Sequence, residues 1–232
     1  MPATQGVASV FRHKVSHHGV NLIVWFQRAK DDFFWKQVFE DSKRRLMVRR
    51  MRISELTHAE LGADLAAAKF VIGKFGGKIQ DETGSWITRV GQLPKKFVES
   101  FKVTAIELTN SNILTEGLDN FAELDYVKSL NLSRNKNLDD FACDIIAREF
   151  RKSRVLESID LSFNEQISVH GLNALFRIPS IRHIRAVQTG ASKYENMDLF
   201  ALLAEDERQC KVVVSDDETI SENTTPPRLL TG

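Results

Sequence analysis

An α/β fold built from repeated strand–turn–helix units is predicted by three features of this 232-residue sequence. First, an apolar triplet recurs, in which the second residue follows the first by three positions and the third follows by two more. Second, the triplets start at Val103, Val127, Leu156 and Ile181, which are 24, 29 and 25 residues apart. Third, apolar residues at helical spacing follow each triplet. A unit of this length cannot bury its apolar face alone, so the units must stack on one another.

Each triplet is predicted to be a strand. The second and third apolar residues of each triplet stand two positions apart, so both point inward and the residue between them points outward. Asn135 and Asn164 stand three residues after the last strand leucine, where the turn of a solenoid needs a side chain that bonds open backbone groups. Ser111 and Thr189 occupy the equivalent places. The period and this turn predict a short leucine-rich-repeat solenoid of about four units.

A helix is expected after each turn, because apolar residues recur there at helical spacing. These sets are Leu114, Leu118 and Phe121; Phe141, Ile145, Ile146 and Phe150; Leu172, Leu175 and Phe176; and Leu199, Leu202 and Leu203.

Composition and charge divide the chain into four parts. With 42% hydrophobic and 27% charged residues and a net charge of +1, the bulk balance requires no nucleic acid or acidic partner. We expect a mitochondrial transit peptide over residues 1–30, an N-terminal helical module capping the solenoid over 31–102, the repeat domain over 103–213, and a disordered acidic tail over 214–232.

The first 30 residues contain basic residues and three histidines but no Asp or Glu, which favours mitochondrial import. The alternative is a basic terminus without an address. The helix expected after it carries a basic cluster that suits an anionic membrane surface or an acidic partner, and equally suits a solvated flank. The cluster consists of Lys43, Arg44, Arg45, Arg49, Arg50 and Arg52.

Several motifs, taken by their order and spacing, resemble one known family between residues 31 and 211. They are Gly62-Ala63-Asp64-Leu65-Ala66-Ala67, Ser85-Trp86-Ile87, Leu93-Pro94, the segment Val103–Ile113, Glu116-Gly117-Leu118-Asp119-Asn120, Leu138-Asp139-Asp140 with Cys143, and Ile167-Ser168 with Gly171-Leu172. The family contains mitochondrial ATP synthase subunit s (coupling factor B) and distal membrane-arm assembly component 2. The chain is more similar to the second branch in its Glu-Gly-Leu-Asp-Asn string, its Ser-Trp-Ile string and its acidic tail.

The resemblance implies a matrix-side mitochondrial protein that helps to build the membrane arm of respiratory complex I, at the inner membrane. The other branch implies an accessory protein of ATP synthase. That branch also implies a magnesium ion held by main-chain oxygens, and the matching positions here are Phe75 and Thr109. The chain departs from the family at Ser111, Asn135 and Asn164, where cysteines are common.

Binding of a protein partner is the function that the residues themselves favour. No catalytic motif is present, and Asp139 and Asp140 are better explained as helix caps than as an acid/base pair. Stacked strands should present outward columns of small and polar side chains, which suit protein rather than nucleic acid. The partner-binding candidates are Glu107, Asn131, Asp160, Arg185, Ser129, Ser158 and His183; a third column comprises Thr109, Ser133, Ser162 and Val187.

Two further alternatives stay open at this point. An F-box-type ubiquitin-ligase adaptor also joins a helical module to leucine-rich repeats, although no convincing F-box stands in residues 31–102. The outward columns are also compatible with a merely solvated surface. Cys143 and Cys210 give no disulfide framework and no metal-ligand spacing.

Overall fold

The computed structural model describes the backbone of residues 32–51, 53 and 55–215, and the side chains of these residues except 32–40, 50, 55 and 56. The chain divides into two compact units, Met1–Arg49 and Arg50–Gly232. Helix α3 (Asp32–Met51) forms the described part of the first unit and ends just inside the second. The predicted transit peptide and the predicted tail beyond Ser215 lie outside the described residues.

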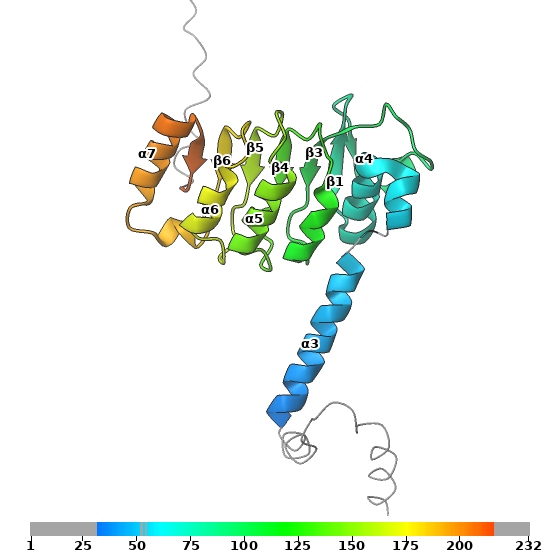
Figure 1. The fold of residues 1–232 in the computed structure, drawn as a ribbon, viewed down its shortest axis with the longest axis horizontal. Coiled ribbons are helices and arrows are strands. Elements are labelled where there is room, and N and C mark those ends of the chain that lie inside the picture. Colours follow the sequence, from blue (N-terminus) through cyan, green and yellow to red (C-terminus); the bar gives the residue numbers. More distant parts are fainter. Residues whose placement is uncertain (1–31, 52, 54, 216–232) are drawn as a thin grey trace, which may run out of the picture. The chain divides into compact units, whose positions relative to one another are not determined.

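A seven-stranded mixed sheet organises the described part of the second unit, and Figure 1 shows its strands side by side. The strand order is β2-β1-β3-β4-β5-β6-β7. Strands β3 to β7 are parallel to one another, whereas β1 is antiparallel to both β2 and β3. The strands are β1 (Lys78–Asp81), β2 (Trp86–Ile87), β3 (Val103–Glu107), β4 (Ser129–Asn131), β5 (Ser158–Asp160), β6 (His183–Arg185) and β7 (Lys211–Val213).

Helices follow the strands and lie along one side of the sheet (Figure 1). This order suits parallel strands, because each needs a crossover before the next strand can begin. The helical elements of this unit are α4 (Glu55–Phe75), the 3-10 helices η1 (Val90–Gln92), η2 (Thr115–Phe121) and η3 (Ala191–Lys193), and the α-helices α5 (Asp140–Glu149), α6 (Val169–Leu175) and α7 (Met197–Arg208).

The parallel strands pair at equivalent positions of successive units, as the triplets predicted. Ile106 lies opposite Leu130, which lies opposite Ile159. Ile184 and Val212 continue the row, and all five side chains are at least 96% buried. This continuous apolar row forms the centre of the core between the sheet and the helices.

Asparagine side chains join neighbouring turns. The Asn135 amide nitrogen donates to the carbonyl oxygens of Leu108 and Leu132, at 2.7 and 2.9 Å. The Asn164 amide repeats this pattern with Leu132 and Leu161, at 3.0 and 2.8 Å. The Asn164 side-chain oxygen also accepts the backbone N–H of Asn135. Both asparagines are fully buried, so the predicted role of these two residues is confirmed.

A column of left-handed backbone conformations accompanies this ladder. Asn110, Arg134, Phe163 and Gln188 have φ angles of 47°, 62°, 64° and 53°, and each directly precedes a ladder residue. None is glycine, although this region is costly for other L-residues. The arrangement is sustained because the surrounding turn is over-determined: the N–H groups of Asn110, Arg134 and Phe163 each bond a carbonyl of the next unit.

The segment predicted as an N-terminal helical module also contains strands, which corrects that expectation. Helix α4 is interrupted at Gly62, whose φ and ψ are 74° and 166°. It ends at Phe75 and is followed by Gly76, with φ of 66°, where the chain turns toward β1. A Cβ atom on Gly77 would lie 2.8 Å from the Glu107 carbonyl oxygen. This close approach lets β1 add to the sheet beside β3.

α-Helices follow the turns of the second, third and fourth repeat units, as predicted. The first repeat unit forms η2, a 3-10 helix, in place of an α-helix, and some residues predicted to be buried in the helices are exposed. Phe141, in the first turn of α5, is 59% exposed. In α7, Leu199, Leu202 and Leu203 are 54%, 63% and 46% exposed, while Met197 and Ala204 are buried. Apolar spacing therefore located α7 but identified the wrong face as buried.

Candidate functional site

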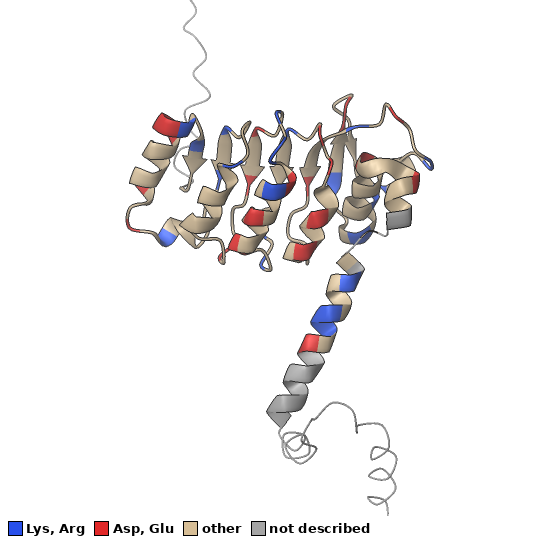
Figure 2. Ribbon diagram, viewed as in Figure 1, with Lys and Arg blue, Asp and Glu red and all other residues tan. Residues whose placement is uncertain are grey.

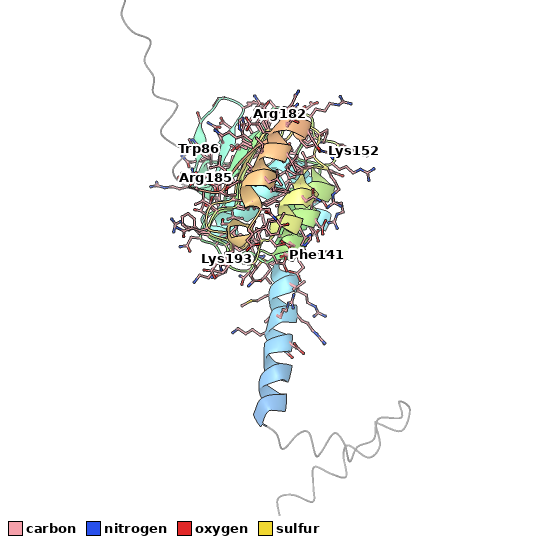
Figure 3. The ribbon with its side chains drawn as sticks, turned by 90° about the vertical axis from the view of Figure 1, so that its left-hand side faces the viewer. Trp86, Phe141, Lys152, Arg182, Arg185 and Lys193 are labelled. Carbon is pink, nitrogen blue, oxygen red and sulfur yellow. The ribbon has the colours of Figure 1, made fainter. Side chains whose placement is uncertain are left out.

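The side of the sheet turned away from α5 and α6 is the candidate site, and we call it the open face. Figure 3 looks along the row of strands and shows Trp86 and Arg185 on this side, away from those helices. Within the described residues of the second unit, no helix covers it (Figure 1). Strand alternation sends the residues on either side of each buried central residue toward this face.

The middle column of the open face consists of residues paired in register. Glu107 lies opposite Asn131, Asn131 opposite Asp160, and Asp160 opposite Arg185. All four are partly exposed. The predicted alignment of the column is therefore confirmed, and its partner-binding role stays a prediction.

Two members of this column also hold the turns that follow their strands. The Asn131 side-chain oxygen accepts the backbone N–H of Ser133 at 3.0 Å. One carboxylate oxygen of Asp160 accepts the N–H of Ser162 at 2.9 Å. Asp160 has no other hydrogen bond or ion pair within the described part of the chain. Its carboxylate therefore leaves a negative charge on the open face.

The two flanking columns behave differently from each other. Ser129 and Ser158 are partly exposed and His183 is exposed, so they belong to the open face. Ala105 in the same column is only 7% exposed. In the third column, Thr109 is partly exposed, whereas Ser133, Ser162 and Val187 are 9%, 1% and 3% exposed. The prediction that this column points outward is wrong for these three residues, which lie buried in the turns after their strands.

Strands β1 and β7 extend the open face beyond the predicted residues. Lys78 pairs in register with Glu107, and its ammonium lies 2.9 Å from that carboxylate. The same ammonium lies 5.2 Å from the centre of the Trp86 ring, which is 45% exposed. Lys211 adds a further cation beside His183. The signal for β1 and β2 was the turn around Gly84, between two short segments that each carry one buried isoleucine.

The predicted basic cluster lies partly on α3, in the other unit. Lys43, Arg44, Arg45 and Arg49 are exposed there. The side chains of Arg50 and Arg52 lie outside the described residues. A membrane or partner contact by this cluster stays a prediction.

The cysteines and histidines of the described residues offer no nucleophile–base pair. Burial raises the pKa of the Cys143 thiol far above its ordinary value. Burial also raises the pKa of Cys210 to about 11, against a smaller opposing effect of Arg182. Both side chains therefore remain protonated thiols, while His170 and His183 are exposed on separate elements. Asp139 accepts the N–H of Ala142 and caps α5, which confirms its predicted capping role.

The positions that match a magnesium site by resemblance are a poor fit for one. Phe75 ends α4 and Thr109 follows β3, and each would contribute a main-chain carbonyl. Magnesium sites in proteins usually include one or two carboxylates, and the nearby Glu107 is already paired with Lys78. Over the described ranges, no group of three or more His, Cys, Asp or Glu side chains is arranged to hold a metal. We derive no function through a metal.

Across residues 32–51, 53 and 55–215, every helix is too short or too polar to cross a bilayer.

Taken as a class, the chain is a mixed α/β protein whose parallel strands repeat in register and leave one sheet face open. It is 32% identical over 151 residues to a Drosophila melanogaster protein named distal membrane arm assembly component 2. The match covers 63% of this chain and 52% of the relative, so the chain spans about half the length of that protein. The resemblance to this family, first noted in the motifs, is confirmed. No family model matches the chain.

Among solved structures, actin-binding site 2 of leiomodin-1 is similar with a TM-score of 0.41 and 23% identity. The superposition covers 48% of this chain and 70% of that one. A likeness this distant carries no argument about fold or function.

Proposed function

We propose that this chain is a non-enzymatic, protein-binding assembly factor for the membrane arm of mitochondrial respiratory complex I. The name of the Drosophila relative supports the assembly role, and the sequence resemblance adds complex I and the matrix side of the inner membrane. The partners would be respiratory-chain subunits or assembly intermediates, and the basic residues of α3 would add peripheral contact with the inner membrane.

The architecture that serves this function is proposed to be a leucine-rich-repeat solenoid. Support comes from the strands that pair at equivalent positions of successive units and from the ladder of Asn135 and Asn164. A stack of this kind presents an extended surface that a partner can engage across several units.

The open face is the single observation that carries the proposal. A protein that positions a partner needs a preformed surface, and this one is built on paired strands whose backbone bonds fix the spacing of Ser158, Asp160 and Arg185. The face mixes both signs of charge with small polar side chains. Such a surface suits a polar protein interface, in which charge complementarity selects the partner.

Native separation of solubilised mitochondria, with mass spectrometry of the co-migrating proteins, tests the function directly. Co-migration with membrane-arm intermediates of complex I is the expected result. Co-migration with ATP synthase, or absence from mitochondria, would contradict the proposal.

Substitutions on the open face test the site. Asp160→Arg and Ser158→Arg should each reduce recovery of the partner, because they place a new cation on the face. Asp160→Asn separates the two roles of the residue: its amide oxygen still accepts the Ser162 N–H, so the fold should be kept, and removal of the charge alone should reduce recovery less than Asp160→Arg. Equal recovery by wild type and both arginine variants, with unchanged melting temperatures, would remove the open face as the binding site.

A further inference from the structure

A second surface lies at the edge of the sheet where the parallel strands begin, and we call it the basic groove. It is a depression of about 740 Å³ lined by Arg151, Lys152, Arg154, Arg182, Glu157 and Ser180. Figure 3 shows Lys152 and Arg182 toward this edge, and Phe141 and Lys193 toward the opposite one. Pro179 completes the lining, so four of its seven residues are cationic, and the open face contributes none of them.

The cations come from two consecutive units and are held on a rigid frame. The N–H of Arg182 donates to the carbonyl of Glu157 at 2.9 Å, in a backbone ladder at the start of the strands. Ser180 donates its hydroxyl to the carbonyl oxygens of Ser153 and Leu156, at 3.2 and 2.9 Å. These bonds join the loop that carries Arg151, Lys152 and Arg154 to the loop that carries Arg182. The backbone positions of the four cationic residues are therefore fixed relative to one another before any ligand arrives.

The groove cations lack acidic partners within the described chain. Glu149, the nearest acid along the sequence, is paired with Arg148 at 2.6 Å. Asp144 is paired with Arg177. None of the four groove cations forms an ion pair with a described residue, and Arg151, Lys152 and Arg154 are all exposed. The C-terminal end of the α5 dipole attracts cations, but Arg148 already lies in that last turn. The dipole does not explain Arg182, which belongs to another repeat unit.

Acidic residues lie on both sides of the groove, because its loops precede β5 and β6 and the strand order is β4-β5-β6-β7. Exposed Glu123 and Asp125 lie in the loop before β4, and exposed Glu205, Asp206 and Glu207 lie in the last turn of α7, ahead of Arg208. Figure 2 shows this turn in red with a blue segment at its end. A long polyanion or a flat anionic membrane would meet these acids together with the cations, and like charges repel it. Glu157, inside the groove, also disfavours a compact phosphate group. A short extended segment with separated carboxylates fits this distribution.

We propose that the basic groove binds a short acidic segment of a protein partner. The cations of two units engage its carboxylates, and the flanking acids limit the bound length to about those two units. Neighbouring strands lie about 4.8 Å apart and an extended chain advances about 3.3 Å per residue, so a hexapeptide is longer than the spacing of the two units. This inference uses a surface distinct from the open face and does not rest on the proposed function.

A fluorescein-labelled hexaglutamate peptide, titrated with the full chain and followed by fluorescence anisotropy, tests the proposal. The double variant Arg151→Glu/Arg154→Glu should weaken binding by about tenfold or more, because charge complementarity at a fixed surface is reversed. Arg182→Glu, from the second loop, should weaken it as well. Added salt should reduce binding by wild type, since the contacts are exposed.

The matched control is Lys136→Glu/Lys193→Glu, which changes the net charge by the same amount on exposed lysines outside the groove. It should bind the peptide within about twofold of wild type. Equal loss by both double variants would show non-specific attraction and overturn the proposal. Failure of wild type to bind hexaglutamate would overturn it too, as would tighter, groove-dependent binding of phosphatidylserine vesicles or of a single-stranded RNA. Melting temperatures matched to wild type confirm that each variant is folded.

Discussion

The central and terminal units of the repeat solve the same turn with different side chains. The central units, which contain β4 with α5 and β5 with α6, use the buried asparagines Asn135 and Asn164. The terminal units, which contain β3 with η2 and β6 with α7, use Ser111 and Thr189. Each asparagine bonds a carbonyl of its own turn and one of the preceding turn, whereas Thr189 donates within its own unit to Ala186.

The difference shows what couples one unit to the next. An amide side chain has two donor hydrogens and an acceptor oxygen, so it can satisfy two turns at once. A hydroxyl has one donor hydrogen: that of Thr189 bonds within its own turn, and that of Ser111 reaches only the Asn135 side chain of the next turn. The helices follow the same division: α5 buries Ala142, Ile145 and Ile146, while α7, the last helix of the described residues, leaves three leucines exposed. The four changes below test this division, from the largest expected effect to the smallest.

Replacement of the central ladder residue should cost the most. Asn164→Ala removes two donated bonds and one accepted bond at a fully buried position, and each orphaned buried group costs about 1–3 kcal/mol. We expect the free energy of unfolding to fall by about 4 kcal/mol. Thr189→Ala should cost about 1 kcal/mol. Urea unfolding measures both, and equal losses would show that the units are not coupled through asparagine.

The same comparison for leucines gives the next effect. Leu161→Ala, in a central unit, should lower the free energy of unfolding by about 3 kcal/mol as a buried large-to-small change, because Leu161 is 0% exposed. Leu202→Ala in α7 should change it by less than about 0.5 kcal/mol, since that side chain is 63% exposed. A large loss from Leu202→Ala would mean that this face of α7 is covered in solution.

Relief of backbone strain at the end of the stack should stabilise the chain slightly. Gln188 is exposed and has a φ of 53°, a conformation that glycine adopts without steric cost. Gln188→Gly should raise the free energy of unfolding by about 0.5–1 kcal/mol after the entropy cost of glycine is subtracted. The melting temperature should rise with it. Gln166→Gly is the control, because Gln166 has no positive φ and should lose stability. A loss from both variants would refute the strain at Gln188.

A carboxylate at the entry to the first unit should give a small effect that depends on pH. Asp64 accepts the N–H of Val103 at 2.9 Å, and burial raises its pKa above the ordinary 3.8, partly offset by that bond and by Lys102. The folded state therefore holds this proton more tightly than the unfolded state. The contribution of Asp64 to stability falls as pH rises from 3.8 through the raised pKa.

Asp64→Asn keeps the accepted bond and removes the titration. The difference in free energy of unfolding between Asp64→Asn and wild type should therefore shift in favour of the variant as pH rises through this range. Urea unfolding at a series of pH values measures it, with Glu195→Gln as an exposed control. A difference that does not change with pH would show that burial of Asp64 carries no such penalty.

Much of the fold could be predicted because strand periodicity and core burial are local properties of the sequence. The spacing of Val127, Leu130 and Leu132 predicts a strand in which Leu130 and Leu132 point inward, and all three residues are fully buried. The polar residues Asn131 and Asp160 were placed on one column correctly, since alternation fixes which residues share a face. What the spacing did not decide was which side of α7 is buried, because no neighbouring unit follows it among the described residues.

The sequence by itself determined the register of the parallel units and the central column of the open face, through the fixed period of apolar triplets and the two turn asparagines. Tertiary structure alone decided the rest. The strand β1 joins the sheet because Gly77 allows a backbone approach that no local pattern records. The basic groove forms because stacking of the repeat units brings two loops together, and these loops carry Arg154 and Ser180, which are 26 residues apart in the sequence. Contacts between distant segments depend on packing and backbone bonding between units, and sequence spacing within one unit does not specify them.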